Sequence, residues 1–145
     1  EVMKPGEVAR GVRYFAGVAR YDRDIDIPAD WLGAGRRVYL DLGRLWVAGE
    51  VSLNGKPLGV VWKEPFRIEI TSAARPGANR LTVAVANTWS NRLTGAARST
   101  SGQRYTRTNI TATDGVPWAK APLLKSGLFG PVRLIPARGP AAALP

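Results

Sequence analysis

The sequence predicts an all-β protein, an antiparallel β-sandwich, on the strength of three observations. Short segments of alternating apolar and polar residues recur along the chain, and Gly, Pro and Asn turns separate them. No long segment has apolar residues at helical spacing. Several short strands joined in this way are typical of two antiparallel sheets packed face to face. One long irregular loop, from Ser90 to Leu128, interrupts the pattern.

The segment from Val47 to Ile70 carries a clear hairpin signal. Asn54-Gly55 supplies the two positive-φ positions of a type I′ turn, with alternating apolar residues on either side. A register that pairs the residues flanking this turn sets Val51 opposite Leu58 and gives the hairpin an apolar face. Because Pro57 cannot donate to a ladder, we expect this arm either at a sheet edge or with its N–H position facing away from a partner strand.

The other strands are expected at the following ranges: 14–27, 36–43, 66–70, 81–89 and 130–136. Between the first two, ADWLGAG predicts a short helical turn that places Trp31 and Leu32 on the core. The predicted organisation is a lead-in or linker over 1–12, a β-sandwich domain over 13–136 and a tail over 137–145.

Composition excludes several kinds of chemistry. The 145 residues include no Cys and no His, so disulfides, thiolate metal sites and Ser-His or Cys-His catalysis are ruled out. No apolar run approaches the length of a membrane span, and the first residues show no signal-peptide core. The net charge of +10 admits nucleic-acid binding, but the arginines are scattered. A solvated basic surface is therefore favoured.

Four segments occur in an order that resembles a known family. They read YDRDIDIP, VYLDLG, VSLNGKPLGVVWKEPFRIEIT and PGANRLTVAVANTWSNRL. Their order is similar to that of the sugar-binding β-sandwich of glycoside hydrolase family 2. The continuation NTWSNRLTG, with the later SGLFGPVRL, more closely resembles the C-terminal β-sandwich of family 106 rhamnosidases and related large bacterial glycosidases. The resemblance covers about residues 11–136, nearly the whole chain.

The resemblance implies a galactose-binding-like jelly roll that serves as an accessory module of a bacterial carbohydrate-active enzyme. It implies no catalysis, because the hydrolytic carboxylates of such enzymes lie in a separate barrel domain. The implied partners are an oligo- or polysaccharide, such as one from plant cell walls, and the catalytic domain of the parent. A secreted or periplasmic location follows. No cofactor is expected, although a structural calcium is compatible with such jelly rolls.

The carboxylates offer two candidate sites, and each has a simpler interpretation. Glu50 and Glu64 form the best pair for glycoside hydrolysis, but surface carboxylates are favoured. Asp22, Asp24 and Asp26 share one face of a strand at spacings of about 6 to 7 Å, too far apart for all three to chelate one ion directly. We therefore interpret this face as solvated.

Sugar recognition needs an aromatic ring to stack on a pyranose and planar polar groups to bind hydroxyls. Trp31 and Trp46 are assigned to core or rim packing. The predicted sugar-binding residues are Trp62, Lys63, Glu64, Trp89, Asn91, Arg92, Tyr105 and Trp118. Two alternatives stay open: Trp62 as a plug of the core, and Asn91-Arg92 as bonds to loop carbonyls that only hold the loop.

Three functions are consistent with these patterns. The leading hypothesis is a non-catalytic carbohydrate-binding or accessory module that combines aromatic stacking with Asn and Arg hydrogen bonds. The second is a structural module that packs against a catalytic domain. The third and least favoured is nucleic-acid or polyanion binding through the basic surface.

Overall fold

The computed structural model describes residues 12–100 and 108–138. The described residues form two compact units. The first, here the sandwich unit, comprises residues 18–86 and 126–138. The second, here the helical unit, comprises residues 12–17, 87–100 and 108–125.

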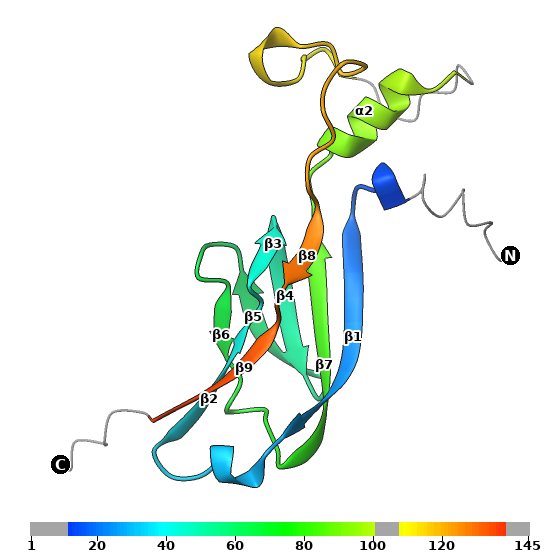
Figure 1. Ribbon diagram of the computed structural model, residues 1–145. Helices are drawn as coiled ribbons and strands as arrows, with labels where there is room; N and C mark the ends of the chain where they lie inside the picture. The colour runs from blue at the N-terminus through cyan, green and yellow to red at the C-terminus, as the bar shows by residue number, and fades with distance from the viewer. Residues whose placement is uncertain (1–11, 101–107, 139–145) are drawn as a thin grey trace, which may run out of the picture. The chain divides into compact units, whose positions relative to one another are not determined.

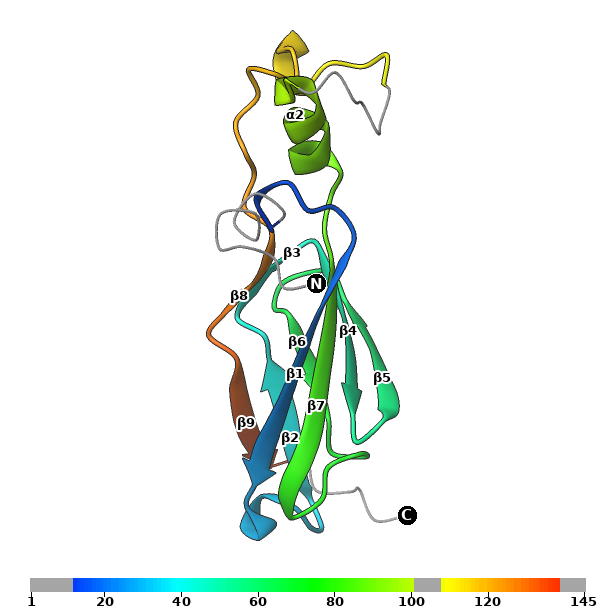
Figure 2. The ribbon, with the colours of Figure 1, turned by 90° about the vertical axis from the view of Figure 1, so that its right-hand side faces the viewer.

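The sandwich unit contains antiparallel strands in three sheets (Figures 1 and 2). The strands are β1 (Val18–Ile27), β2 (Arg36–Asp41), β3 (Arg44–Trp46), β4 (Ala48–Leu53), β5 (Lys56–Val61), β6 (Arg67–Glu69), β7 (Gly77–Ala86), β8 (Gly127–Gly130) and β9 (Arg133–Arg138). The sheet orders are β1-β7-β4-β5, β6-β2-β9 and β3-β8.

One hydrophobic core joins the two larger sheets. Val51 of β4, Val83 of β7 and Leu40 of β2 are each at most 2% exposed, and all belong to the same cluster of buried side chains. Leu42, which follows β2, is also fully buried. Because residues of both sheets share this core, the sheets pack face to face, and the predicted antiparallel sandwich is confirmed.

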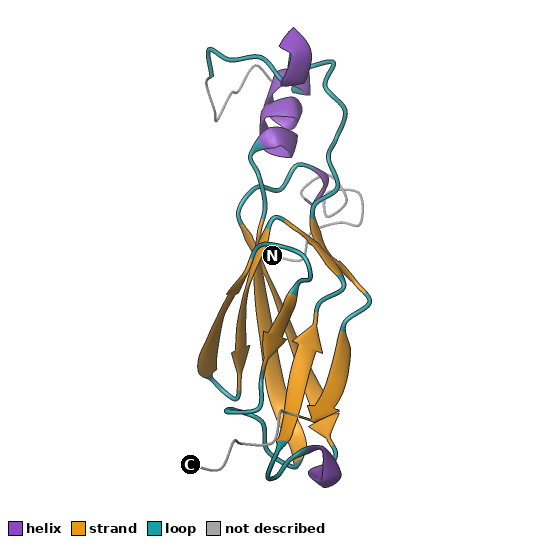
Figure 3. Ribbon diagram, turned by 90° about the vertical axis from the view of Figure 1, so that its left-hand side faces the viewer, coloured by secondary structure: helices purple, strands orange, loops and turns teal. Residues whose placement is uncertain are grey.

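The short helical turn between β1 and β2 is also present. It is a 3₁₀ helix, η1 (Ala29–Trp31), and Trp31 and Leu32 pack against the core. Figure 3 shows it as the helical element beside the strands of this unit. The turn ends the long β1 strand and returns the chain to the second sheet, where β2 begins at Arg36.

The hairpin of β4 and β5 forms around the predicted turn. Asn54 and Gly55 have φ values of 53° and 79°, as a type I′ turn requires, and β5 with its Pro57 is an edge strand. The predicted register was wrong beyond the first pairs, because a bulge shifts Val51 opposite Gly59 instead of Leu58. The added residue turns Val61 into the core and leaves Val60 57% exposed.

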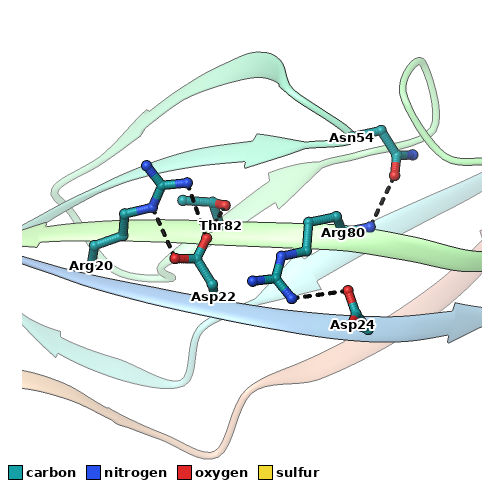
Figure 4. Close-up of polar contacts among 6 residues, drawn as sticks. All are labelled: Arg20, Asp22, Asp24, Asn54, Arg80 and Thr82. Carbon is teal, nitrogen blue, oxygen red and sulfur yellow. Dashed lines mark hydrogen bonds and ion pairs between the residues drawn. The ribbon is translucent and has the colours of Figure 1, made fainter.

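The outer face of β1 and β7 carries a row of polar contacts (Figure 4). Arg20 Nε donates to Asp22 Oδ2 over 2.9 Å, and the Thr82 hydroxyl donates to Asp22 Oδ1 over 2.5 Å. The Thr82 hydrogen bond, followed by that from Arg20, lowers the pKa of Asp22. Asp24 pairs with Arg80 at 3.1 Å. These exposed pairs agree with the interpretation of this aspartate row as a solvated face.

The segment expected as one irregular loop contains a helix in its first part. The helix α2 (Ser90–Arg98) is followed, after the gap in the described residues, by the 3₁₀ helix η2 (Thr113–Gly115). The buried side chains of α2 are Asn91 and Thr94, which are polar. These polar side chains weaken the apolar periodicity by which a helix of nine residues could be recognised, and the expectation of a wholly irregular loop was wrong for this reason.

The final strand also differs from the sequence-based expectation. Instead of one strand over 130–136, the chain forms β8 up to Gly130 and β9 from Arg133, with Pro131 between them. β8 pairs with β3, a short strand that the alternation pattern does not reveal, and β9 pairs with β2. No helix among the described residues is long and apolar enough to cross a membrane.

Candidate functional site

The sandwich unit has a cleft of about 660 Å³ where three chain connections meet. These connections are β2 to β3, β5 to β6 and β8 to β9. The lining residues are Asp41, Gly43, Arg44, Glu64, Pro65, Phe66, Gly130, Pro131 and Arg133. The volume lies in the range of pockets that hold small molecules.

Two glycines allow the backbones under the cleft to touch. Gly43 and Gly130 form an isolated parallel bridge, and their φ values are 65° and 66°. A Cβ on Gly43 would lie 2.4 Å from the carbonyl carbon of Gly130. Any side chain at position 43 would therefore push the two connections apart, and glycine is required for this close approach.

Main-chain hydrogen bonds hold the β5–β6 connection against the β2–β3 connection. Leu42 N donates to Phe66 O over 2.9 Å, and Arg67 N donates to Pro65 O over 2.7 Å. The side chain of Phe66 is buried in the core. The cleft walls thus rest on the hydrophobic core, which gives the exposed side chains a defined support.

Both carboxylate oxygens of Asp41 accept hydrogen bonds from other residues at the cleft. Its Oδ2 accepts from Arg67 Nη2 over 2.8 Å, and its Oδ1 accepts from Gly43 N over 2.8 Å. The Arg67 hydrogen bond, then the Gly43 hydrogen bond, lower the pKa of Asp41, and the nearby charges of Arg67 and Arg133 lower it further. This carboxylate is therefore ionised at neutral pH and orders the β2–β3 connection.

The remaining charged groups of the cleft are available to a ligand. Arg44, Arg133 and Glu64 are exposed, and none of them forms a hydrogen bond or ion pair with another described residue. Arg133 stands opposite Asp41 in the β2–β9 register, while Arg44 stands opposite Gly130. With Asp41 neutralised by Arg67, two guanidinium groups face one carboxylate, so the cleft carries a net positive charge.

The predicted residues of the β5–β6 connection lie next to this cleft along the chain. Glu64 lines it, and Trp62 and Lys63 precede Glu64 on the same loop. Trp62 is 69% exposed, so the alternative in which it plugs the core was wrong. Trp62 is not among the lining residues, but its exposed indole, on the loop that contributes Glu64, is a group that can stack on a sugar ring.

The predicted residues of the helical unit have mixed surroundings. Trp89, directly before α2, is 64% exposed. Trp118 is half-buried, and its Nε1 donates to Ile110 O over 2.9 Å. Arg92 is half-buried on α2. Tyr105 lies outside the described residues.

Asn91 has an internal role in the helical unit. It is 6% exposed, its Nδ2 donates to Leu124 O and its Oδ1 accepts from Leu124 N, each over 2.8 Å. Arg98 acts similarly, because its guanidinium donates to Ala119 O and Ala121 O over 2.9 and 2.7 Å. These are the contacts expected of the alternative in which the polar side chain holds the loop.

Sequence reasoning missed Arg44, Arg133 and Asp41 as residues of the cleft. Each lies within two residues of a turn glycine or proline at a strand end, which is only a weak sequence signal of a site. What places Asp41 beside Arg133 is the pairing of β2 with β9, and strands far apart in the sequence give no local sign of their pairing. In the parts of the chain that the structure describes, no group of three or more carboxylate side chains could hold a metal ion.

Comparison with known proteins relates the chain to bacterial glycoside hydrolases. A curated protein named "Putative beta-glucuronidase" from Formosa agariphila is 44% identical over 85 residues, which are 59% of this chain and 7% of that protein. No model of a known protein family matches the sequence.

Solved structures give the same relation. A rhamnosidase from Novosphingobium sp. PP1Y matches with a TM-score of 0.76 and 44% identity, over 88% of this chain and 12% of that one. An FMN-binding β-glucuronidase from Facaelibacterium prausnitzii L2-6 shares the fold with a TM-score of 0.52 at 22% identity, over 89% of this chain and 18% of that one. The chain thus corresponds to a small part of each of these enzymes.

Proposed function

We propose that this chain is a non-catalytic accessory β-sandwich of a bacterial glycoside hydrolase, and that it contacts carbohydrate at the β5–β6 loop and the adjoining cleft. The observation that carries the proposal is the 44% identity with part of a rhamnosidase over 88% of this chain, at a TM-score of 0.76. An identity of this size over most of the chain indicates common descent of the module. Covering 12% of the enzyme, the module is one part among several.

The sugar-binding part of the proposal is supported by the loop of Trp62, Lys63 and Glu64. An indole that is 69% exposed offers a flat apolar surface, and the ammonium and carboxylate groups next to it can bind hydroxyls. Trp89, Arg92, Tyr105 and Trp118 are proposed as a separate, secondary contact. Asn91 is the weakest member of the set, because both ends of its amide are already bonded to Leu124.

Two observations favour an accessory role over hydrolysis. A glycosidase general acid needs a raised pKa, whereas the hydrogen bonds to Asp41 and Asp22 lower the pKa of both carboxyls. Glu50 lies in β4 and is not among the residues of the cleft, which Glu64 lines. The proposed partners are an oligo- or polysaccharide and the catalytic domain of the parent, in a secreted or periplasmic setting.

Affinity electrophoresis through gels containing different polysaccharides tests this proposal. We expect at least one polysaccharide to retard the chain, and Trp62→Ala to lose about five- to tenfold in affinity, since stacking on one aromatic ring is worth about 1–1.5 kcal/mol. The matched control is Trp46→Ala, a tryptophan that is 50% exposed and absent from the predicted site. Both variants should keep the thermal stability of the parent chain.

The same experiment separates the second hypothesis, a purely structural module. In that case no polysaccharide retards the chain, and sugars leave the fluorescence of the exposed tryptophans unchanged. Such a result would remove the carbohydrate contact from the proposal and keep the accessory module. Equal loss of binding in the Trp62 and Trp46 variants would instead show that the site was misplaced.

A further inference from the structure

We infer that the cleft of the sandwich unit binds the carboxylate of an acidic saccharide, a uronic acid residue, between Arg44 and Arg133. The inference rests on the proposed carbohydrate contact and specifies its ligand class. It starts from the two guanidinium groups, which line one cleft and form no hydrogen bond or ion pair within the described residues. Guanidinium groups bind carboxylates through paired, charge-assisted hydrogen bonds.

The backbone fixes both arginines relative to the cleft. Arg133 begins β9 and is held opposite Asp41 by the β2–β9 ladder, and Arg44 begins β3 and is held opposite Gly130. The Gly43–Gly130 contact brings these two connections together beneath the cleft. An anion between the arginines would therefore meet guanidinium groups carried on paired strands rather than on free loops.

The internal charges of the cleft favour an anion with hydroxyl groups. Asp41 already accepts from Arg67 and from Gly43 N, so its negative charge is compensated within the protein. Glu64 has no such partner among the residues that the structure describes, and it lines the same cleft, where its carboxylate can accept hydrogen bonds from hydroxyl groups. A simple inorganic anion would be repelled by Glu64 and would donate no hydrogen bond to it. A uronic acid brings both a carboxylate for the arginines and hydroxyl groups that can donate to Glu64.

The apolar part of the lining suits a sugar ring. Pro65 and Pro131 lie among the lining residues, and Phe66 contributes from the edge of the core. The C–H face of a pyranose can pack on such surfaces while its substituents reach the charged groups. The volume of about 660 Å³ accommodates a saccharide.

Titrations of the ¹⁵N-labelled chain, followed by NMR, test the inference. The probes are an oligogalacturonate, a neutral galacto-oligosaccharide of equal length, an oligoglutamate peptide of equal charge and inorganic sulfate, at an ionic strength of about 0.1 M so that distant charges are screened. We expect the oligogalacturonate to bind at least about tenfold more tightly than each other probe. Its largest amide shifts should fall at Gly43 and Gly130.

The variant that removes both guanidinium groups is Arg44→Gln/Arg133→Gln. It should weaken oligogalacturonate binding by about tenfold or more, since a hydrogen bond to a charged group is worth about 1.5–3 kcal/mol. The matched control is Arg36→Gln/Arg138→Gln, an exposed pair that stands at the far ends of β2 and β9. It removes the same charge and should change the affinity by less than about twofold.

Several results would overturn the inference. Equal binding of the neutral oligosaccharide would reject the carboxylate contact and leave the proposed carbohydrate function standing. Absence of binding by both saccharides would reject the carboxylate contact, and the carbohydrate contact itself would fall only if no polysaccharide retards the chain in the affinity gels. Equal or tighter binding of the oligoglutamate would make the cleft a docking contact for protein carboxylates, and equal binding of sulfate would make it an unspecific anion site. Equal losses in the two double variants would show an effect of net charge alone.

Discussion

Asn79 shows how a single buried amide fixes the end of the sandwich. It is 2% exposed, and its Oδ1 accepts from Asn54 Nδ2 and Arg75 N over 2.8 and 3.0 Å. Its Nδ2 donates to Arg75 O and Gly77 O, each over 2.7 Å. Asn54, a residue of the type I′ turn, also donates to Ala73 O and accepts from Arg80 N. The hairpin turn is thereby bonded to the connection that precedes β7.

We predict that Asn79→Ala lowers the free energy of unfolding by about 2–3 kcal/mol, because it leaves buried polar groups without partners. The melting temperature should fall by about 5–10 °C for a chain of this size. Thermal denaturation followed by circular dichroism measures the change. Asn109→Ala is the matched control, since Asn109 is exposed and should be replaceable without loss. Equal melting temperatures for the two variants would contradict the role given to Asn79.

At the scale of elements, α2 is held by contacts of small and polar residues. Thr94 is fully buried, and its hydroxyl has no hydrogen-bond partner among the described residues. Gly95 packs against Tyr14, so closely that a Cβ on the glycine would lie 2.5 Å from Cγ of the tyrosine ring. Because Cγ is bonded directly to Cβ of Tyr14, it cannot move as the tip of a long side chain can, so glycine is required at this helix position.

These contacts predict opposite effects for two neighbouring substitutions. Gly95→Ala raises helix propensity by about 1 kcal/mol, but overpacking against Tyr14 costs about 1–3 kcal/mol, so we expect a net loss of stability. Thr94→Val removes a buried hydroxyl that lacks a partner and should stabilise the helical unit by about 1 kcal/mol.

Hydrogen exchange of the α2 amides measures both changes locally. Exchange should accelerate in Gly95→Ala and slow in Thr94→Val. Thr111→Val provides the control, because Thr111 is exposed and the same chemical change there should leave the exchange rates unaltered. Faster exchange in Thr94→Val would mean that its hydroxyl has a hydrogen bond in solution.

The same elements show how far the sequence predicts the structure. Alternation identifies β2, and it identifies β7 with shifted ends, because the strand predicted over 81–89 spans Gly77–Ala86. Asn54-Gly55 identifies the hairpin turn, because this signal lies within a few residues. The bulge in β5 depends on Gly59, whose φ of +133° the sequence permits but does not require. The helix α2 escapes detection because its buried residues are polar.

The candidate site was predicted only in part, because local sequence patterns do not show which distant segments meet at the cleft. Of the residues that line the cleft, the sequence predicts Glu64, and it leaves open whether the neighbouring Trp62 is exposed or plugs the core. The partners of Glu64 in the cleft come from other strands, and only the pairing of β2 with β9 and of β3 with β8 brings them to one place. Such pairing is decided by the packing of the whole sandwich, which no local pattern contains.

At the scale of the whole molecule, the chain passes from β7 into the helical unit and returns at β8. The exit and the return lie close together in the sandwich. Val47 N donates to Ala86 O at the end of β7, and the preceding residue, Trp46, pairs with Gly127 at the start of β8. A short connection could therefore close the sandwich without the helical unit, since loop closure over a short distance costs little.

We predict that a variant in which a short Gly/Ser linker replaces residues 88–125 still folds as a sandwich. The core of the two large sheets belongs entirely to the sandwich unit, so its main driving force is retained. Circular dichroism should show an antiparallel sheet with a cooperative thermal transition. A companion variant of the shortened chain, Val83→Asp, serves as the reference without a folded core, because Val83 is 2% exposed.

The shortened chain also locates the carbohydrate contact. If Trp62 and the cleft bind the saccharide, affinity electrophoresis should give the shortened chain the affinity of the full chain, within about twofold, because every contacting group is still present. If binding disappears while the sandwich stays folded, the contact belongs to Trp89 and the rest of the helical unit. A shortened chain that resembles its Val83→Asp companion would show that the sandwich depends on the helical unit for its stability.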